Sequence, residues 1–241
     1  MKKVYRAFDK CEGVEQDPPQ TACFWHDHIL RPQTTPLQIT LLQSLKNDNI
    51  IVLRGFWHDT QENTLNFIIE LCTSCSLRNY RKKHCHVSLI AVKNRARQIL
   101  KGLNYLHPHE PCIIHRDINC NNVFINGDLG EVKIGDIGLA ALVRKSRVAH
   151  SLLGTPGYMA SELYVDIYAL GMCLLEMATD EVPYGEYQNV VQIYKKVSLG
   201  VKPKAMERVG DEELRVLLIS VLGSQGIGPL LLIFSRTSFC L

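Results

Sequence analysis

Three oxygen-bearing side chains stand in an order that suits the transfer of a phosphoryl group. Asp117 ends a His-Arg-Asp run, Asn122 follows five positions later, and Asp136 comes after a segment with the pattern of a hairpin. A carboxylate can accept the proton of an attacking hydroxyl, and carboxylate and amide oxygens are ligands that suit Mg²⁺. The pattern therefore predicts Asp117 as the catalytic base, with Asn122 and Asp136 as ligands of the magnesium that bridges the phosphates of ATP.

The neighbouring residues predict the elements that must hold these side chains. Strands over 123–125 and 131–134 indicate a hairpin, because the Asn-Gly pair that follows the first strand tolerates the positive φ of a tight turn. Ser88 is a suitable N-cap for a helix with apolar residues at helical spacing, and 165–178 has the pattern of a buried helix. We expect the catalytic loop to lie on this second helix, which begins near Asp166.

The first part of the chain has the pattern of strands more than of helices. Three strands and one short helix are predicted there, over 4–8, 50–57, 65–71 and 35–46. Residues 13–35 give no clear pattern. From Ser76 onward helices prevail, including an amphipathic one over 190–197. The sequence thus predicts an α+β fold with a strand-rich first part and a larger helical part.

Composition narrows the class of protein. The 241 residues carry a formal net charge of +3 with a pI near 8.3, which is too mild to favour nucleic acid or a membrane as a partner. We interpret the one basic cluster, 78–86, as a solvated helix face. Nine cysteines, irregularly spaced, favour reduced thiols in the cytoplasm over a disulfide framework. A zinc site at Cys72-x-x-Cys75 is the weaker alternative, because no second ligand pair follows at zinc-finger spacing.

Several stretches resemble the With-No-Lysine (WNK) family of serine/threonine kinases, most closely its plant members. The resemblance is carried by residues 4–9, 45–51, 76–84, 130–136, 171–177 and 192–197. It implies a two-lobed, protein kinase-like fold. The implied parts are a kinase domain over 1–222, divided into an N-lobe over about 1–71 that is incomplete at its start and a C-lobe over about 72–222, and an atypical apolar tail over 223–241.

The resemblance also assigns roles to individual residues. Lys2 corresponds to the lysine that anchors ATP, and Glu70 and Cys72 belong to the hinge whose backbone would hydrogen-bond adenine. Ser151 matches the activation-loop phosphorylation site, and Thr155 matches the loop threonine near the substrate. ATP and Mg²⁺ are therefore the implied cofactors, and the implied substrate is a protein that offers a Ser or Thr hydroxyl.

The chain departs from the family pattern at positions that bear on catalysis. Gln38 stands where a glutamate should pair with the ATP-anchoring lysine, and Asn119 replaces the catalytic-loop lysine that neutralises the transferred phosphate. Ser161 replaces a proline near the end of the activation loop, and several residues are missing after Tyr164. We therefore expect strain or a repositioned helix at this shortened link.

Three functional hypotheses follow from this pattern. The first is a serine/threonine kinase, weakened by its departures, that transfers the γ-phosphate of ATP to protein hydroxyls. The second is a catalytically inactive pseudokinase that acts as a protein-binding module, and the third is a truncated product without function. The intact Asp117, Asn122 and Asp136 favour the first hypothesis, whereas Gln38 and Asn119 favour the second.

Overall fold

A computed structural model describes most of the chain. The described residues are 3–8, 21–28, 43–61, 64–70, 72, 75–84, 87–109, 112–126, 130–136, 141–143 and 159–223. The chain divides into two compact units, Met1–Thr73 and Ser74–Leu241. This division falls close to residue 71, where the resemblance places the end of the N-lobe.

The first unit contains a four-stranded antiparallel sheet in the order β1-β2-β4-β3. Its strands are β1 (Lys3–Phe8), β2 (Thr21–His28), β3 (Leu53–Asp59) and β4 (Thr64–Glu70). The strands predicted over 4–8, 50–57 and 65–71 are confirmed, although β3 begins three residues late. The sequence pattern misses β2. This strand pairs with β1 on one side and β4 on the other, and β4 lies far along the chain, so local pattern alone does not reveal it.

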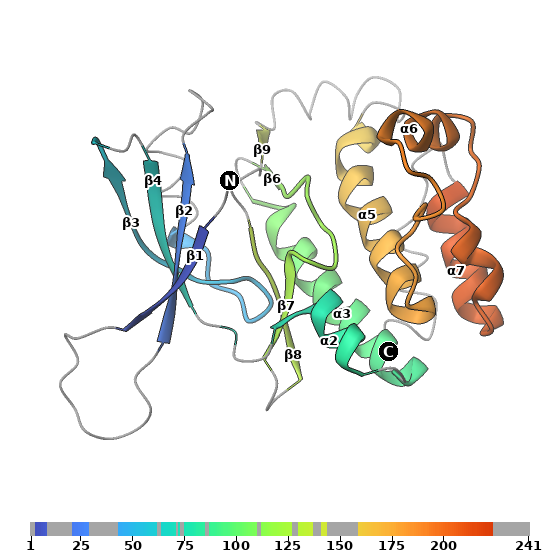
Figure 1. The fold of residues 1–241 in the computed structure, drawn as a ribbon, viewed down its shortest axis with the longest axis horizontal. Helices are drawn as coiled ribbons and strands as arrows, with labels where there is room; N and C mark the ends of the chain where they lie inside the picture. The colour runs from blue at the N-terminus through green and yellow to red at the C-terminus, as the bar shows by residue number, and fades with distance from the viewer. Residues whose placement is uncertain are drawn as a thin grey trace. The chain divides into compact units, whose positions relative to one another are not determined.

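The second unit is mainly helical and is arranged around α5 (Met159–Thr179). Both α3 (Leu89–Leu106) and α7 (Glu212–Gly223) pack against α5, and Figure 1 shows α5 between them. The helix predicted after Ser88 is confirmed by α3, and the Ser88 hydroxyl accepts a hydrogen bond from Ala91 N at 3.2 Å. The buried residues of α3 are Val92, Ala96, Ile99, Leu100, Gly102, Leu103 and Leu106.

The start of α5 corrects two expectations. The sequence pattern predicts that this helix begins near Asp166, but α5 begins at Met159 and continues past Tyr164 without a break. Ser161 is the third residue of α5, so residues 159–164, where a strained link was expected, are helical. The shortened link has therefore become part of α5 itself.

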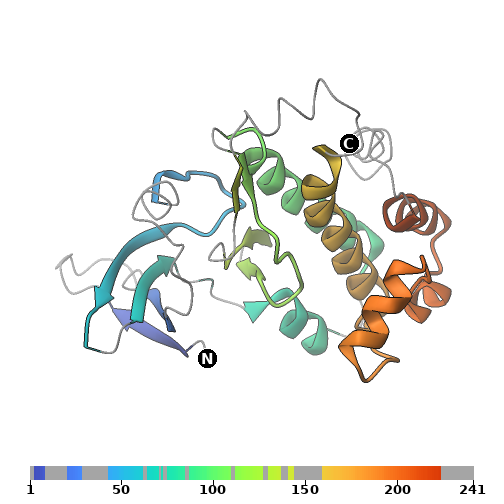
Figure 2. The ribbon, with the colours of Figure 1, turned by 90° about the horizontal axis from the view of Figure 1, so that it is seen from above.

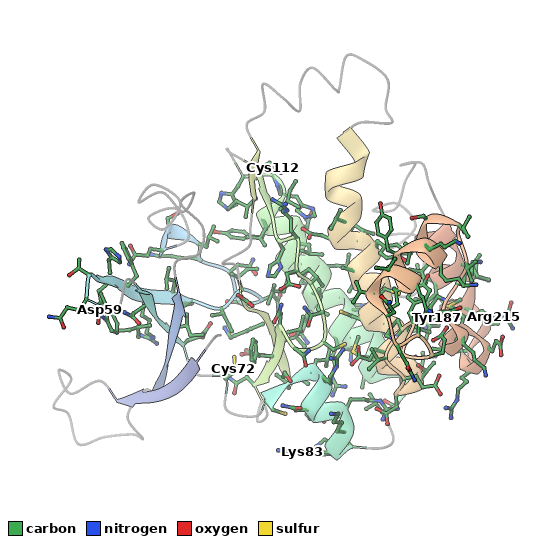
Figure 3. The ribbon with its side chains drawn as sticks, turned by 45° about the horizontal axis from the view of Figure 1, so that its top comes forward. Asp59, Cys72, Lys83, Cys112, Tyr187 and Arg215 are labelled. Atoms are coloured by element: carbon green, nitrogen blue, oxygen red, sulfur yellow. The ribbon has the colours of Figure 1, made fainter. Side chains whose placement is uncertain are left out.

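The basic cluster over 78–86 is only partly a solvated face, which corrects the interpretation above. The Arg78 guanidinium pairs with both carboxylate oxygens of Glu176 on α5, at 2.5 and 2.8 Å. Arg81 is buried and donates to Met177 O at 3.0 Å. These two arginines fasten α2 (Leu77–Lys83) to α5, whereas Lys83, labelled in Figure 3, is exposed at the helix end.

Two short helices complete the described part of the second unit. The predicted helix over 190–197 is confirmed by α6 (Val190–Ser198), and η2 (Lys204–Arg208) is a 3-10 turn. Of the helix predicted over 35–46 in the first unit, only residues 43–46 are described, and residues 43–44 are helical. Within the described residues, no helix has the length and apolar character needed to cross a bilayer.

Candidate active site

The catalytic loop, residues 115–122, runs between two small sheets in the second unit. The strands of these sheets are β5 (Cys75–Ser76), β6 (Cys112–Ile114), β7 (Val123–Asn126), β8 (Glu131–Ile134) and β9 (Ala141–Val143). The pairing of β7 with β8 confirms the predicted hairpin, and β6 pairs with β9. Because β6 precedes the loop and β7 follows it, both ends of the loop are held by strand pairing.

The two predicted magnesium ligands lie at the two ends of this hairpin. Asn122 immediately precedes β7, and Asp136 follows the end of β8 by two residues. Gly135 N donates a hydrogen bond to Asn122 O at 2.8 Å, which joins the two ends of the hairpin. The fold therefore brings together two residues that are separated by the whole hairpin in the sequence.

The Asp117 carboxylate is held by two side-chain amides. Asn119 Nδ2 donates to Asp117 Oδ1 at 3.0 Å, and Asn122 Nδ2 donates to Asp117 Oδ2 at 2.9 Å. The same two nitrogens also donate to the Asp117 carbonyl oxygen, at 3.1 and 2.9 Å. This arrangement, here called the amide clamp, fixes the orientation of the predicted base.

Asn119 has its polar atoms engaged within the loop itself. Its Nδ2 takes part in the amide clamp, and its Oδ1 accepts a hydrogen bond from Asn121 N at 2.9 Å. The side chain is neutral and short, so it cannot supply the charge that a lysine would bring to a transferred phosphate. The sequence shows that Asn119 lacks the charge of the expected lysine, but it does not predict that the Asn119 amide hydrogen-bonds to Asp117.

A buried carboxylate beneath the loop anchors its backbone. Asp166 on α5 is fully buried, and it accepts hydrogen bonds from His115 N at 2.9 Å and Arg116 N at 2.8 Å. His107 Nε2 lies 2.9 Å from the same carboxylate. Burial alone would raise the pKa of Asp166, but the hydrogen bonds from His107 and from the two backbone groups hold it below its usual value.

This anchor fulfils the expectation that the loop lies on the helix containing Asp166, and it adds a residue that the sequence reasoning missed. His107 directly follows α3, far from Asp166 in sequence, and no motif or spacing marks it. Only the packing of α3 against α5 brings the imidazole to Asp166.

His115 connects the loop to the end of β8. It is fully buried, its Nε2 lies 2.8 Å from Gly135 O, and its Nδ1 accepts a hydrogen bond from Asp117 N at 3.3 Å. These bonds require the neutral tautomer with the proton on Nε2. Burial lowers the pKa of His115 below its ordinary value, which favours the same neutral form.

Backbone strain occurs at two positions of the site. Arg116 has φ of 67° and Asp136 has φ of 59°, in the left-handed region that non-glycine residues seldom adopt. Such a conformation costs roughly 1–2 kcal/mol per residue unless local bonds offset it. At Arg116 the backbone N–H is held by Asp166, so the anchor beneath the loop also maintains the strained geometry.

The donor set fits a magnesium ion better than zinc or iron. Because Asn122 Nδ2 is used in the amide clamp, its Oδ1 is the atom that remains for a metal, and Asp136 supplies a carboxylate. These are hard oxygen donors, and magnesium binds through one or two carboxylates together with phosphates and waters. No group of three or more His, Cys, Asp or Glu side chains suited to a metal occurs within the described residues.

The remaining predicted site residues are placed only in part. Glu70 ends β4, and its backbone N–H and carboxylate both bond to Val52, at 3.0 and 2.8 Å. Cys72 is half-buried. The roles predicted for four other residues cannot be compared with the structure, because Lys2, Gln38, Ser151 and Thr155 lie outside the described residues.

Comparison with known proteins gives a consistent result. Residues 26–222 match the protein kinase domain family. The probable serine/threonine-protein kinase WNK5 of Oryza sativa subsp. japonica is 50% identical over 239 residues, which cover 92% of this chain and 71% of the relative. The serine/threonine-protein kinase WNK8 of Arabidopsis thaliana is 45% identical, over 99% of this chain and 44% of the relative.

A further relative and a solved structure extend the comparison. The probable serine/threonine-protein kinase WNK10 of Arabidopsis thaliana is 48% identical over 89% of this chain and 42% of its own length. This chain thus spans less than half of either Arabidopsis protein. The crystal structure of Rad53 1–466 in complex with AMP-PNP is similar with a TM-score of 0.72, at 23% identity, over 92% of this chain and 56% of that one. At that identity the likeness establishes the fold alone.

Proposed function

This chain belongs to the WNK family of serine/threonine protein kinases, and from that membership we propose that it phosphorylates Ser or Thr hydroxyls of proteins at a reduced rate. The observation that carries the proposal is the amide clamp, which presents an oriented Asp117 carboxylate beside the joined ends of the hairpin. In this orientation the Asp117 carboxylate can accept the proton of a substrate hydroxyl.

Each residue of the site has a separate task in this proposal. Asp117 accepts the proton of the substrate hydroxyl, so that the hydroxyl oxygen can bond to the γ-phosphorus while the bond to the ADP oxygen breaks. Asn122 Oδ1 and the Asp136 carboxylate would hold Mg²⁺, which neutralises phosphate charge when bound. His115 and Asp166 do not touch the substrate; they position the loop through its backbone.

The reduced rate follows from Asn119. Loss of a positive charge beside a desolvated transition state costs on the order of 3 kcal/mol, or about a hundredfold in rate. In addition, the Asn119 amide donates to the base, so it stabilises the carboxylate before it takes up the proton. Substitution of Gln38 for the expected glutamate would lower the rate further, because an amide cannot supply the charge that pairs with a lysine.

The remaining assignments form part of the same proposal. Glu70 and Cys72 would contribute backbone groups to adenine binding, and Lys2 would contact the phosphates of ATP. Phosphorylation of Ser151 would order the activation loop by pairing with Arg116, with Thr155 near the substrate. A hydrogen bond with Cys173 and burial raise the pKa of Cys120, which favours its thiol form. The irregular spacing of the nine cysteines supports a reducing compartment such as the cytoplasm.

A phosphotransfer assay with the full chain tests the proposal. We expect incorporation of phosphate from Mg-ATP into a library of Ser/Thr peptides, and into Ser151, to exceed that of an Asp117→Asn control. Asn119→Lys should raise the rate, by about a hundredfold at most. Incorporation no greater than in the Asp117→Asn control, in protein that unfolds cooperatively, would exclude catalysis and leave the pseudokinase hypothesis in its place.

Nucleotide binding needs a separate measurement, because a pseudokinase can retain it. Mg-ATP should raise the unfolding temperature of the chain, and Asp136→Asn should reduce this shift while leaving the unfolding temperature without nucleotide nearly unchanged. An equal shift with ATP in the presence and absence of Mg²⁺ would contradict the role given to Asn122 and Asp136.

A further inference from the structure

The helix α6 has an unusual balance of composition and burial. It is nine residues long, it begins after Asn189, whose side chain accepts a hydrogen bond from Val191 N at 2.8 Å, and it contains no buried residue. Yet Val190, Val191 and Tyr194 are apolar or aromatic, and they are 78%, 72% and 75% exposed. An apolar helix face left in water is a common mark of a binding surface.

These three side chains lie on one side of the helix. Spacings of one, three and four residues bring them within the same half of an α-helix, while Ile193 and Lys196, which are half-buried, lie toward the other half. Helices of this length are not stable alone in water, so packing on the half-buried side holds α6 in place. The exposed side contributes little to the fold and is available for another purpose.

A hollow lies along a different side of α6 from Val190 and Tyr194, and Lys195 stands between the two sides. It has a volume of about 280 Å³ and is lined by Tyr187, Gln192, Lys195, Lys196 and Leu199. Figures 1 and 2 show α6 at the edge of its unit, and Tyr187, labelled in Figure 3, lies just before it in the chain. Lys196 Nζ is 5.8 Å from the centroid of the Tyr187 ring, so the hollow combines an aromatic wall with positive charge.

The charge of this segment has one sign only. Residues 187–204 contain four lysines, Lys195, Lys196, Lys202 and Lys204, and no aspartate or glutamate. Lys195 and Lys196 belong to α6, and Lys202 follows it, where Lys195 and Lys202 are exposed. Lys204 begins η2, and its backbone N–H donates to Glu186 Oε1 at 3.0 Å, so a carboxylate lies close to Lys204 and the charge of this surface comes from the other three lysines. A partner that covers the surface therefore has to bring acidic side chains to avoid repulsion.

From these observations we propose that α6 and its hollow bind an acidic segment of a partner protein. The surface, here called the α6 surface, comprises Val190, Val191, Tyr194, Lys195, Lys196 and Leu199. The segment would place apolar side chains against Val190, Val191 and Tyr194, cross the helix at Lys195, and place a carboxylate in the hollow. The proposal concerns binding outside the active site and does not depend on catalysis.

Two other occupants fit the surface less well. A second copy of this chain, related by twofold symmetry, would bring the same lysines against each other and would be repelled. An anionic membrane would satisfy the charge, but an interfacial helix inserts a protruding apolar face and leaves a charged hollow at its side without a role. The peptide-binding experiment below distinguishes a second copy and a membrane from a protein segment.

Selection from a display library of random peptides, with the full chain as target, tests the proposal. We expect the enriched peptides to combine Glu or Asp with apolar residues at helical spacing. Their affinity, measured by fluorescence anisotropy, should fall about tenfold or more for Tyr194→Ser and for Lys195→Glu. Affinity should be unchanged in Asp117→Asn, so loss of catalysis leaves this inference intact.

The matched control is Ile90→Ser. Ile90 lies on α3 and is 72% exposed, against 75% for Tyr194, so Ile90→Ser removes a similarly exposed apolar side chain at a different site from Tyr194→Ser. An equal loss of affinity in Ile90→Ser would overturn the proposal, as would enrichment of basic or uncharged peptides or of none. Binding to phosphatidylserine vesicles without peptide binding, or dimerisation that Tyr194→Ser abolishes, would assign the surface to a membrane or to a second copy instead.

Discussion

The helices α3 and α6 carry the same sequence signals but have opposite surroundings. Both have apolar residues at helical spacing, and both begin with a side-chain cap. In α3 the Ser88 hydroxyl accepts a hydrogen bond from Ala91 N, and in α6 the Asn189 side chain accepts one from Val191 N. Seven residues of α3 are buried, whereas none of α6 is. The comparison shows that an amphipathic pattern predicts a helix but does not say what covers its apolar side.

The physical difference lies in the neighbours of each helix. Along its length α3 packs against α5, β6 and β8, so its apolar side chains exchange water for protein. In α6, by contrast, Val190, Val191 and Tyr194 remain mostly in water. We therefore expect substitutions in α3 to change the stability of the fold, and those in α6 to change binding.

The largest effect is expected for Leu103→Ala in α3. Leu103 is 1% exposed, and its truncation removes buried methyl groups and leaves a cavity. The free energy of unfolding should fall by about 3 kcal/mol, as measured by urea denaturation. A loss below about 1 kcal/mol would mean that the α3 side of the comparison is less tightly packed than its burial indicates.

A pH dependence should follow from the buried loop that α3 and α5 support. Burial lowers the pKa of His115, and the opposing effects of Gly135 O, Asp166, Asp136 and Asp117 only reduce this shift. As the pH falls, His115 therefore gains a proton in the unfolded state at a higher pH than in the folded state. The free energy of unfolding should therefore decrease as pH falls below 6.5, by at most about 1.4 kcal/mol per pH unit. His115→Gln should flatten this slope, and an unchanged slope would assign the dependence to another group.

Removing the N-cap of each helix in turn gives a matched pair of variants with a smaller expected effect. Ser88→Ala should lower the global free energy of unfolding by about 1 kcal/mol, because α3 is part of the core. Asn189→Ala removes an equivalent cap, but its effect should be confined to faster amide hydrogen exchange within α6. Equal global losses from both variants would show that α6 supports the fold as much as α3 does.

The smallest effect is expected for Val191→Ser. Its side chain is 72% exposed, so the free energy of unfolding should change by about 0.5 kcal/mol or less. A thermal or urea unfolding curve that overlays the wild type, together with weaker binding of an acidic peptide, would separate the two roles. A loss of several kcal/mol would contradict the exposed placement of this residue.

Local patterns were sufficient where neighbours in sequence set the structure. The cap at Ser88 and the hairpin after Asn122 were predicted because each depends on residues within one turn or one strand pair. The order of Asp117, Asn122 and Asp136 likewise marked the candidate site, since these residues lie on one loop and one hairpin.

Long-range relations were not predictable in the same way. The Asp166 anchor joins residues about fifty positions apart, and its contact with His107 depends on how α3 packs on α5. The pattern also missed β2, whose pairing partner β4 lies far along the chain. The burial of Arg81 was missed for the same reason, because its partners lie on α5.

The sequence by itself determined the family, the α+β fold class, most helices and strands of the described chain, and the order of the candidate catalytic residues. These depend on residue type and short spacing, which are visible along the chain. Only the tertiary structure decided that Asn119 binds the base, that Asp166 and His107 support the loop, and that α3 is covered while α6 is not. Such facts depend on which distant surfaces meet, because burial and hydrogen bonding are properties of contacts rather than of the residues alone.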